Sequence, residues 1–278
     1  MRLSIVTINY NNAEGLLRTL ASVAAQTYQD IEHIIVDAAS TDGSVEIIKE
    51  YADKVGYPVS WSSKKDKGVY NGMNIGIQRA TGDYIQILNS GDVLAASNVT
   101  ELMFAALPEG TPIFYGNMLK SYDGKHIINR DTCGERMYTP ESFLYFYKGT
   151  LNHDCAYIRR DLFDKYGLYN EDMKICSDWE WYVRAIVLGG EKTVYTNIDV
   201  TIFDMNGVSE SYGKNAELIK KERREYLKKI LPATILHDYD MFAFPILQYQ
   251  RLKKYHLWGI VYFMERVLFK LNKWHVLK

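Results

Sequence analysis

Asp92 is the side chain in this sequence best placed to bind a metal ion. It follows an apolar, strand-like run over residues 84–88, and Asn89 and Gly91 interrupt that run before the carboxylate. Hard oxygen ligands suit Mg²⁺ and Mn²⁺, which keep several waters and bind substrate phosphates. We therefore predict that Asp92 is a metal ligand and that the Asn89 amide orients the site. The alternative is a turn or capping carboxylate after Gly91.

A second group of carboxylates, Asp178 and Glu180, lies at the start of a predicted helix and alternates with tryptophans. A carboxylate there could take a proton from a sugar hydroxyl as a general base, and the face of Trp179 could pack on a sugar ring. Because Asp178 and Glu180 are two residues apart, they point in different directions, and only one is expected to be the base. We choose Asp178. The alternative is that both acids only interact with the helix dipole.

Asp37 and Asp66 are candidates for binding a nucleoside. Asp37 ends a predicted buried strand and could accept hydrogen bonds from a ribose or a base, or else cap the following helix. Asp66 and Gly68 precede another predicted helix. The carboxylate could accept from a base N–H, and glycine lets the backbone approach a ligand closely. The alternative for Asp66 is a solvated turn, since residues 64–67 are all charged.

Two further polar side chains could complete a site. His153 follows an irregular aromatic region over residues 130–150 and could bind a phosphate, a sugar or the metal, or serve as a structural histidine. Asp204 follows a strand-like run over residues 200–203 and could close the site.

These side chains depend on a sheet that brings them together. Strand-like runs over residues 3–8, 31–37, 59–61 and 84–88 alternate with helical patterns. This alternation predicts an α/β fold with a mostly parallel central sheet, right-handed crossovers and flanking helices. Such sheets bind ligands at the carboxyl ends of their strands, which is where the sequence places Asn9, Asp37 and Asp92.

Composition sets the limits of the fold. The chain has 278 residues, 47% of them hydrophobic, which suffices for one large domain or a domain with an appendage. Its net charge of −1 gives no nucleic-acid signal. Residues 214–278 nevertheless carry 14 Lys and Arg against 6 Asp and Glu, whereas residues 1–213 carry 19 against 28. We predict a domain over residues 1–213 and a basic, amphipathic helical extension over residues 214–278.

The three cysteines, Cys133, Cys155 and Cys176, are odd in number and lack metal-ligand spacing, which indicates reduced thiols in a cytoplasmic protein. The N-terminal run turns polar too soon for a signal peptide, and the apolar run over residues 257–264 is well short of the roughly 20 residues that span a bilayer. No GxGxxG follows the first strand, and GxxxxGK[ST] and GxSxG are missing. Hydride transfer and P-loop phosphoryl transfer therefore lose support.

Several segments together resemble a known family, the family 2 glycosyltransferases, which have the Rossmann-like GT-A fold and invert the anomeric configuration. The resemblance is carried by Ser4–Asn11, Ser22–Ser44, Asp66–Gly91 and Asp178–Glu180. The segment Leu88–Asp92 is similar to a bacterial polysaccharide-synthesis branch that includes colanic acid glycosyltransferases. The match is specific through about residue 115, looser to about residue 210, and does not extend to the tail.

The resemblance implies a role for each matching position. Asp92 would bind a Mg²⁺ or Mn²⁺ ion, and Asp178 would be the catalytic base. The nucleoside of a UDP-sugar or similar donor would be held by Thr7, Asn9, Asp37, Asp66 and Gly68. The side chains expected near the donor sugar or the acceptor are Asn89, His153, Trp179 and Glu180. This sequence departs from the family where Ala38 follows Asp37, and where Asn89 and Gly91 occupy positions that are often acidic.

The predicted function is sugar transfer, with inversion, from a nucleotide-diphosphate donor to a hydroxyl of a glycan or lipid-linked glycan in the synthesis of bacterial cell-surface polysaccharide. One rival is a nucleotidyltransferase that makes such donors, but these enzymes usually need a glycine- and basic-rich first loop, and residues 7–12 are not one. A second rival is a nucleotide-sugar-binding protein of the same fold without catalytic activity.

The basic extension suggests a partner of its own. Residues 220–229 form a predicted basic helix, and residues 257–268 place apolar side chains on one face beside Arg266, Lys270 and Lys273. Basic amphipathic helices lie on anionic membranes. Because polysaccharide acceptors are often lipid-linked, we predict peripheral contact with the inner face of the cell membrane. The alternatives are packing on the larger domain or on a second copy in a homodimer.

Overall fold

The computed structural model describes residues 1–122, 126–131, 142–205 and 215–273. The chain divides into two compact units, Met1–Tyr226 and Leu227–Lys278. The predicted boundary after residue 213 lies outside the described residues. The structure assigns most of helix α8 (Ala216–Ile230) to the larger unit.

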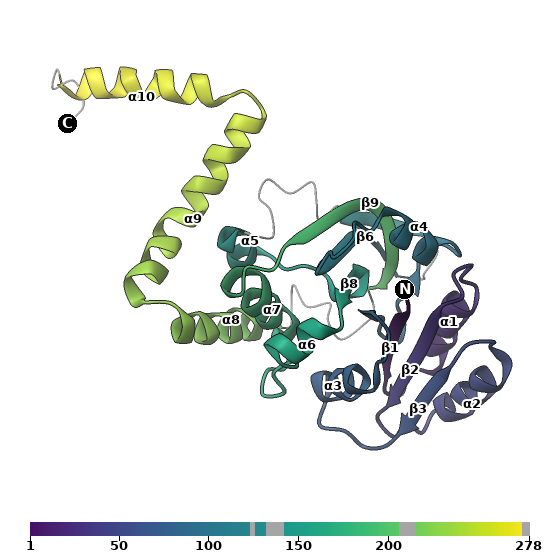
Figure 1. Ribbon diagram of the computed structural model, residues 1–278. Helices are drawn as coiled ribbons and strands as arrows, with labels where there is room; N and C mark the ends of the chain where they lie inside the picture. The colour runs from purple at the N-terminus through teal and green to yellow at the C-terminus, as the bar shows by residue number, and fades with distance from the viewer. Residues whose placement is uncertain (123–125, 132–141, 206–214, 274–278) are drawn as a thin grey trace. The chain divides into compact units, whose positions relative to one another are not determined.

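The N-terminal part of the larger unit alternates strands with helices, as predicted (Figure 1). β1 pairs in parallel with β2 and with β4, and β2 pairs in parallel with β3. The carboxyl ends of these strands therefore lie at one edge of the sheet, where Asn9 is the register partner of Asp37. The elements are β1 (Leu3–Asn9), α1 (Ala13–Ala24), β2 (Ile31–Asp37), α2 (Ser44–Lys54), β3 (Val59–Ser63), α3 (Val69–Arg79) and β4 (Tyr84–Ile87).

Later strands extend the sheet and add antiparallel neighbours. The described strands form one nine-stranded sheet in the order β3-β2-β1-β4-β8-β6-β9-β5, with β7 beside β6. β8 runs antiparallel to β4 and β6, whereas β6 and β9 are parallel. A 3₁₀ turn (His153–Cys155) precedes β8, and a π-helical segment (Val183–Leu188) follows α7. The elements are β5 (Val93–Leu94), α4 (Val99–Ala106), β6 (Ile113–Ser121), β7 (Ile127–Asp131), α5 (Phe143–Lys148), β8 (Ala156–Arg159), α6 (Asp161–Tyr166), α7 (Ser177–Tyr182) and β9 (Thr193–Asp204).

Helices cover both faces of the parallel strands. α1 and α2 pack on one face, where Leu16 and Ile48 contact Ile35 of β2 in a buried cluster. α3 packs on the other face and approaches β1 through glycine, because a Cβ at Gly76 would overlap the side chain of Val6. This close approach fixes the segment that precedes α3 at the carboxyl edge of the sheet, where the predicted site residues Asp66 and Gly68 lie.

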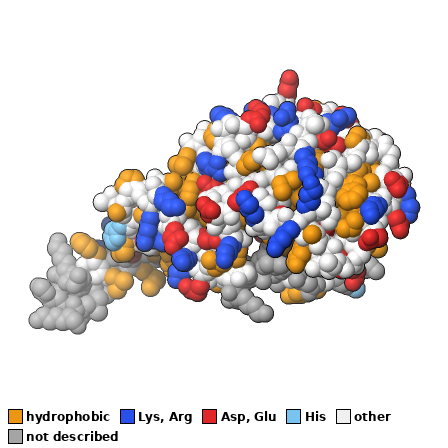
Figure 2. Space-filling view, turned by 90° about the horizontal axis from the view of Figure 1, so that it is seen from below, with side chains coloured by type: hydrophobic (Ala, Val, Ile, Leu, Met, Phe, Trp, Pro, Cys, Tyr) orange, Lys and Arg blue, Asp and Glu red, His pale blue; other side chains and the backbone are white. Residues whose placement is uncertain are grey.

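The smaller unit consists of the end of α8, α9 (Ala233–Lys254) and α10 (Trp258–Lys273). Among the described residues, no helix is both long and apolar enough to cross a membrane. Figure 2 shows acidic and basic side chains interspersed over the face of the molecule that it displays. Cys155 and Cys176 are buried, and Cys133 lies outside the described residues.

Candidate active site

A cavity of about 750 Å³ opens at the carboxyl edge of the parallel strands. Its volume falls within the roughly 300–1,000 Å³ that is usual for small-molecule sites. The walls come from the ends of β1, β2, β4 and β9 and from the segment before α3. The lining residues include the predicted site residues Asn9, Asp66, Gly68, Asn89 and Asp92, together with Tyr10, Asn11, Asn12, Lys65 and Asp204.

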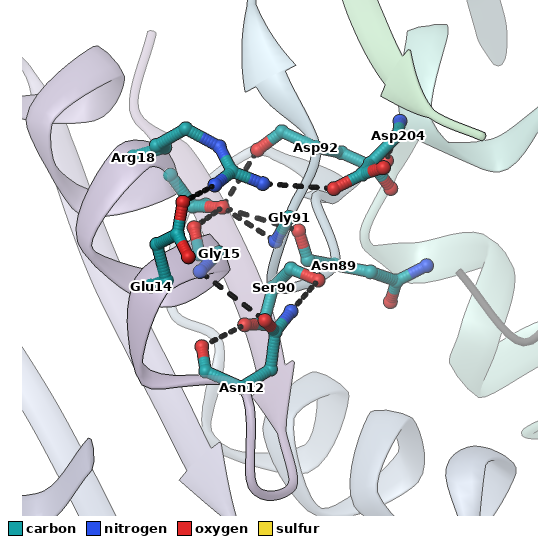
Figure 3. A network of polar contacts seen from close by, with 10 residues as sticks. Asn12, Glu14, Gly15, Arg18, Asn89, Ser90, Gly91, Asp92 and Asp204 are labelled. Atoms are coloured by element: carbon teal, nitrogen blue, oxygen red, sulfur yellow. Dashed lines mark hydrogen bonds and ion pairs between the residues drawn. The ribbon is translucent and has the colours of Figure 1, made fainter. Parts of the chain in front are cut away.

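The loop after β4 is held against α1 by hydrogen bonds (Figure 3). Gly91 has φ +111°, a conformation that L side chains rarely adopt, and this turn presents Asp92 to the cavity. The Gly91 N–H donates to Thr19 Oγ1 (2.9 Å), and the Thr19 hydroxyl donates to the Asp92 carbonyl (2.7 Å). The Asn12 amide donates to the Ser90 carbonyl (3.0 Å). Helix α1 therefore positions the predicted metal ligand through backbone contacts.

The Asp92 carboxylate is only 4% exposed and lies among other acids. Burial, and then the charge of buried Asp154, raise the pKa of Asp92 well above its ordinary value. Its Oδ1 accepts from the Asp204 backbone N–H (2.9 Å). Asp204 in turn accepts from Arg18 (2.8 Å), which also pairs with Glu14 (3.1 Å; Figure 3). Asp204 lines the cavity, and its closing of a site stays a prediction.

The donor set suits a hard divalent cation that is shared with a ligand. No group of three or more His, Cys, Asp or Glu side chains in the described ranges could hold a metal ion without further ligands. Mg²⁺, however, usually binds through one or two carboxylates plus substrate phosphates and water. Asp92 supplies a buried carboxylate, and Asn89 supplies a buried amide oxygen that has no partner among the described residues.

Asp178 lies at the N-terminal end of α7 and is held as a carboxylate. His153 Nδ1 lies 3.2 Å from one oxygen, and the Tyr70 hydroxyl donates to the other (3.1 Å). Burial raises the pKa of Asp178, but the hydrogen bond and charge of His153, with smaller contributions from the Trp179 N–H and Tyr70, bring it below its ordinary value. Asp178 is therefore ionised at neutral pH, as a general base must be.

A chain of contacts connects Asp178 to the cavity. The Asn89 amide nitrogen lies 3.1 Å from His153 Nε2, and His153 Nδ1 bonds Asp178. In the neutral ring, with the Asn89 amide in this orientation, Nε2 accepts and Nδ1 donates to the carboxylate. When the ring is protonated, Nδ1 still donates to Asp178, and the ring adds a positive charge. Burial lowers the pKa of His153, but Asp178 and the nearby acids Asp154 and Asp92 raise it above its ordinary value. Asp178 itself is absent from the cavity wall, whereas Asn89 is part of it.

The predicted nucleoside residues fall into two groups. Asn9 lines the cavity, whereas Thr7 and Asp37 are completely buried beneath it. Asp37 accepts from the Asn9 amide (2.8 Å), from the Ser40 hydroxyl (2.5 Å) and backbone N–H (2.9 Å), and from Ser63 (2.6 Å). Burial raises the pKa of Asp37, but these donors bring it below its ordinary value. Asp37 thus holds the cavity wall from inside the protein.

The other side of the cavity is formed by the segment before α3 and by the end of β1. Asp66 accepts from the Gly68 N–H (2.9 Å), and Gly68 has φ +120°, which favours glycine. Tyr10 is 67% exposed and lines the cavity. Asn11 and Ala39, which also line it, have positive φ (46° and 58°), a conformation that costs energy in residues other than glycine and is concentrated at functional sites.

The structure does not bring Trp179 and Glu180 to the cavity. Trp179 is 1% exposed, and its indole N–H donates to the Phe146 carbonyl (2.8 Å). Glu180 is buried and pairs with Arg184 (2.9 Å). Both side chains anchor α7 in the protein interior. Glu180 and Asp178 have different partners, in agreement with the different directions that their two-residue spacing predicts.

Local sequence patterns missed Tyr70, Asp154, Asn12 and Arg18. Tyr70 lies within a segment that carries the family resemblance, but its contact with Asp178 crosses 108 residues. Arg18 reaches Asp204 across 186 residues. Asp154 was visible only as the neighbour of His153. The Asn12 side chain also caps α1, because its Oδ1 accepts from the Gly15 N–H (3.2 Å).

The fold and the cavity define an α/β protein with a ligand site at the carboxyl edge of its parallel strands. The family model of glycosyl transferase family 2 matches residues 4–167, which is more than half of the chain. An uncharacterized glycosyltransferase of Mycobacterium tuberculosis is 31% identical over 208 residues, 74% of this chain and 76% of that protein. The chain therefore belongs to glycosyl transferase family 2.

Solved structures confirm the predicted GT-A fold. TarS 1–349 of S. aureus in complex with UDP-GlcNAc aligns with a TM-score of 0.65 at 19% identity, over 84% of this chain and 67% of that chain. A second structure, TarS 1–349 in complex with UDP, aligns over 73% of this chain and 60% of that chain. The mannosyltransferase PcManGT of Pyrobaculum calidifontis, in complex with GDP-Man and Mn²⁺, aligns with a TM-score of 0.61 at 16% identity, over 92% of this chain and 72% of that chain.

Proposed function

We propose that this chain transfers a sugar from a UDP-sugar to a hydroxyl of a glycan or lipid-linked glycan, with inversion at the anomeric carbon, in cell-surface polysaccharide synthesis. The observation that carries the proposal is the arrangement at the cavity. Asp92 is buried in its wall, and Asn89 and His153 connect that wall to the ionised Asp178. A metal-binding carboxylate and a separate base are what displacement of a nucleoside diphosphate requires.

The nucleoside of the donor would occupy the side of the cavity formed by Asn9, Tyr10 and Asp66. Asn9 has a buried amide oxygen without a partner among the described residues, so it can accept from a base or ribose. The exposed Tyr10 ring offers a stacking surface for a base. TarS, a structural neighbour, was solved with UDP and with UDP-GlcNAc, which supports a uridine donor.

The chemistry follows from a single in-line attack. Asp178 accepts the proton of the acceptor hydroxyl while that oxygen bonds to the anomeric carbon. The bond from this carbon to the diphosphate oxygen breaks, and the nucleoside diphosphate leaves with the electron pair. Because one displacement occurs without a covalent enzyme intermediate, the configuration inverts. His153 and Tyr70 hold the carboxylate in place through hydrogen bonds of 3.2 and 3.1 Å.

Asp92 would hold a divalent cation together with the donor diphosphate, and Asn89 would orient that end of the site. A bound Mg²⁺ or Mn²⁺ supplies neutralisation of the charge that builds on the leaving diphosphate. The neighbour PcManGT was solved with GDP-Man and Mn²⁺, which supports this assignment.

The test begins with a panel of nucleotide sugars, in which release of nucleoside diphosphate identifies the donor. Asp178→Asn should then reduce kcat by roughly 10²–10⁴-fold. Donor affinity measured by calorimetry should stay unchanged, because Asp178 is absent from the cavity wall. Asp164→Asn, at a carboxylate 81% exposed on α6, is the matched control and should keep full activity. Transfer by Asp178→Asn at a near wild-type rate would show that Asp178 is not the base.

The same assays separate the rival functions. A nucleotidyltransferase would consume a nucleoside triphosphate and a sugar phosphate and release pyrophosphate. A binding protein without catalytic activity would bind UDP in calorimetry but turn over no donor. Either result would replace the proposed function.

We also propose that α10 lies on an anionic membrane surface, where a lipid-linked acceptor would be found. Ile260, Met264 and Leu268 follow one helix face and are at least half exposed. Arg266 and Lys270 lie on another face and are exposed. Residues 227–278 carry nine Lys and Arg against three Asp and Glu, so a second smaller unit would repel this one, whereas anionic lipid would attract it.

Vesicle flotation tests this contact. Full-length protein should float with phosphatidylglycerol vesicles and not with phosphatidylcholine vesicles. The double variant Ile260→Asp/Met264→Asp should lose flotation, and Leu102→Asp, at an exposed position of α4, should keep it. No flotation, combined with a dimer in light scattering that the double variant abolishes, would assign the apolar face to a homodimer instead.

A further inference from the structure

We propose that Glu222, on α8, is a positioning residue for the catalytic base. This inference rests on the proposed role of Asp178 and assigns a function to a helix that follows the segment matched by the family model. Glu222 touches neither the cavity nor Asp178, so it acts only through the backbone that precedes α7.

Glu222 accepts three hydrogen bonds from consecutive backbone N–H groups. One carboxylate oxygen accepts from Lys174 (2.7 Å), and the other accepts from Ile175 (3.2 Å) and Cys176 (3.0 Å). These residues lead directly into α7, which begins at Ser177 and carries Asp178. Because the bonds are to an ionised group, they are among the stronger ones in proteins, and together they determine where α7 begins.

The same backbone segment is held from its other side by Tyr70. The single hydroxyl hydrogen of Tyr70 is shared between the Ile175 carbonyl oxygen (2.6 Å) and Asp178 Oδ1 (3.1 Å). Ile175 therefore donates its N–H to Glu222 and offers its carbonyl to Tyr70. A shift of this segment would change both the Tyr70 contact and the position of Asp178.

α8 also contacts the far side of α7. The Trp179 ring packs edge-on against Tyr226, with centroids 5.8 Å apart, and the Arg223 guanidinium lies 5.1 Å from the Trp179 ring centroid. Burial and then the charge of the nearby Glu180 carboxylate raise the pKa of Tyr226. Glu222 thus fixes the start of α7, while Arg223 and Tyr226 hold the Trp179 side chain.

The contacts of Glu222 and Tyr70 with residues 174–176 matter because the hydrogen bonds that hold the Asp178 carboxylate are already long. The bonds to His153 and Tyr70 measure 3.2 and 3.1 Å, so a further displacement of a few tenths of an ångström weakens both. A base displaced by about 1 Å costs roughly 10²-fold in rate. In the proposed mechanism the acceptor proton moves to Asp178 during the attack, whereas the donor occupies the cavity, whose wall does not include Asp178. Loss of Glu222 should therefore lower kcat and leave donor binding intact.

Two substitutions of Glu222 should lower kcat to different extents. Glu222→Ala removes all three acceptor contacts and should lower kcat by about 10–100-fold with the donor KM unchanged. Glu222→Gln keeps the shape but turns one oxygen into an N–H donor that faces another donor, so its kcat should lie between those of Glu222→Ala and the wild type. The matched control is Glu225→Gln on the same helix, an exposed carboxylate that should retain wild-type kcat and KM.

Hydrogen exchange measures the contact between Glu222 and the backbone amides of residues 174–176 independently of activity. The amides of Lys174, Ile175 and Cys176 should exchange faster in Glu222→Ala than in Glu225→Gln, while the cavity strands stay protected. Unchanged exchange would refute the contact. Faster exchange with unchanged kcat, or a rise in donor KM as large as the fall in kcat, would refute the positioning role. A wild-type chain that turns over no nucleotide sugar would refute the proposed function. The exchange data would still test the hydrogen bonds between Glu222 and the backbone of residues 174–176.

Discussion

Acid should destabilise this protein through one buried histidine, His33 of β2, which is completely buried. His33 Nε2 lies 2.9 Å from Thr7 Oγ1, and Nδ1 lies 2.7 Å from the Tyr51 hydroxyl. Thr7 donates its hydroxyl hydrogen to the Leu88 carbonyl (2.8 Å), so Nε2 must donate to Thr7 and Nδ1 must accept from Tyr51. Burial favours the neutral ring. Protonation at Nδ1 would require the Tyr51 hydroxyl to turn its hydrogen from His33 to the Tyr57 hydroxyl, 2.6 Å away.

The size of the effect follows from the pKa. Burial lowers the pKa of His33 from 6.5 to about 3. Because the folded-state value is the lower one, the unfolded chain binds the proton first as pH falls. The contribution to stability is complete above the unfolded pKa and is lost progressively below it, with a slope of about 1.4 kcal/mol per pH unit. Between pH 6 and pH 4.5 the loss amounts to about 2 kcal/mol.

Urea denaturation at pH 4.5, 5, 5.5 and 6 would measure this loss. Other ionisable groups also make the stability depend on pH, but they do so equally in wild type and variant. The informative quantity is therefore the difference in free energy of unfolding between wild type and His33→Gln. That difference should change by about 2 kcal/mol over the range. His237→Gln, at an exposed position of α9, is the control and should parallel the wild type. Parallel pH profiles of wild type and His33→Gln would refute the reasoning.

Three further substitutions test the site. Tyr10→Ala should weaken UDP binding in calorimetry by about tenfold, because stacking of one base on an aromatic ring contributes roughly 1–3 kcal/mol, whereas Tyr10→Phe should bind normally. His153→Ala should move the acidic limb of the kcat–pH profile to higher pH, because the pKa of Asp178 rises once its main hydrogen-bond donor is removed. Gly91→Ala should lower the free energy of unfolding by about 1–3 kcal/mol in urea titrations, because φ is +111° and the new Cβ would lie 3.3 Å from Asp204 Oδ2.

The parallel half of the fold was predictable because its information is local. Each of the runs 3–8, 31–37 and 84–88 is apolar enough for a strand buried on both faces, and each is followed by turn and capping residues. The topology of such units then requires their carboxyl ends to meet at one edge. Asn9 and Asp92 were placed correctly at the cavity for that reason.

The remainder depends on contacts that no local pattern contains. β8 enters between β4 and β6 in antiparallel orientation, a pairing set by residues more than 70 positions away from β4. Trp179 is a residue type that often stacks on sugar rings, yet Tyr226 and Arg223 of α8 cover it. An aromatic residue beside a candidate catalytic carboxylate therefore has the same sequence pattern whether its side chain faces a ligand or the core. Only the position of α8 distinguishes the two.

The distribution of hydrogen bonds separates direct ligand contacts from supporting ones. Asp37 accepts four hydrogen bonds within the protein, and Thr7 is bonded to Leu88 and His33, so neither needs a ligand. Asn9 and Asn89 each line the cavity with a buried amide oxygen that lacks a partner among the described residues. Buried acceptors of this kind cost free energy until a donor reaches them. Because Asp37 binds the Asn9 amide nitrogen, it leaves the Asn9 oxygen as the group available to a nucleoside. We infer that Asp37 contributes to donor binding through Asn9.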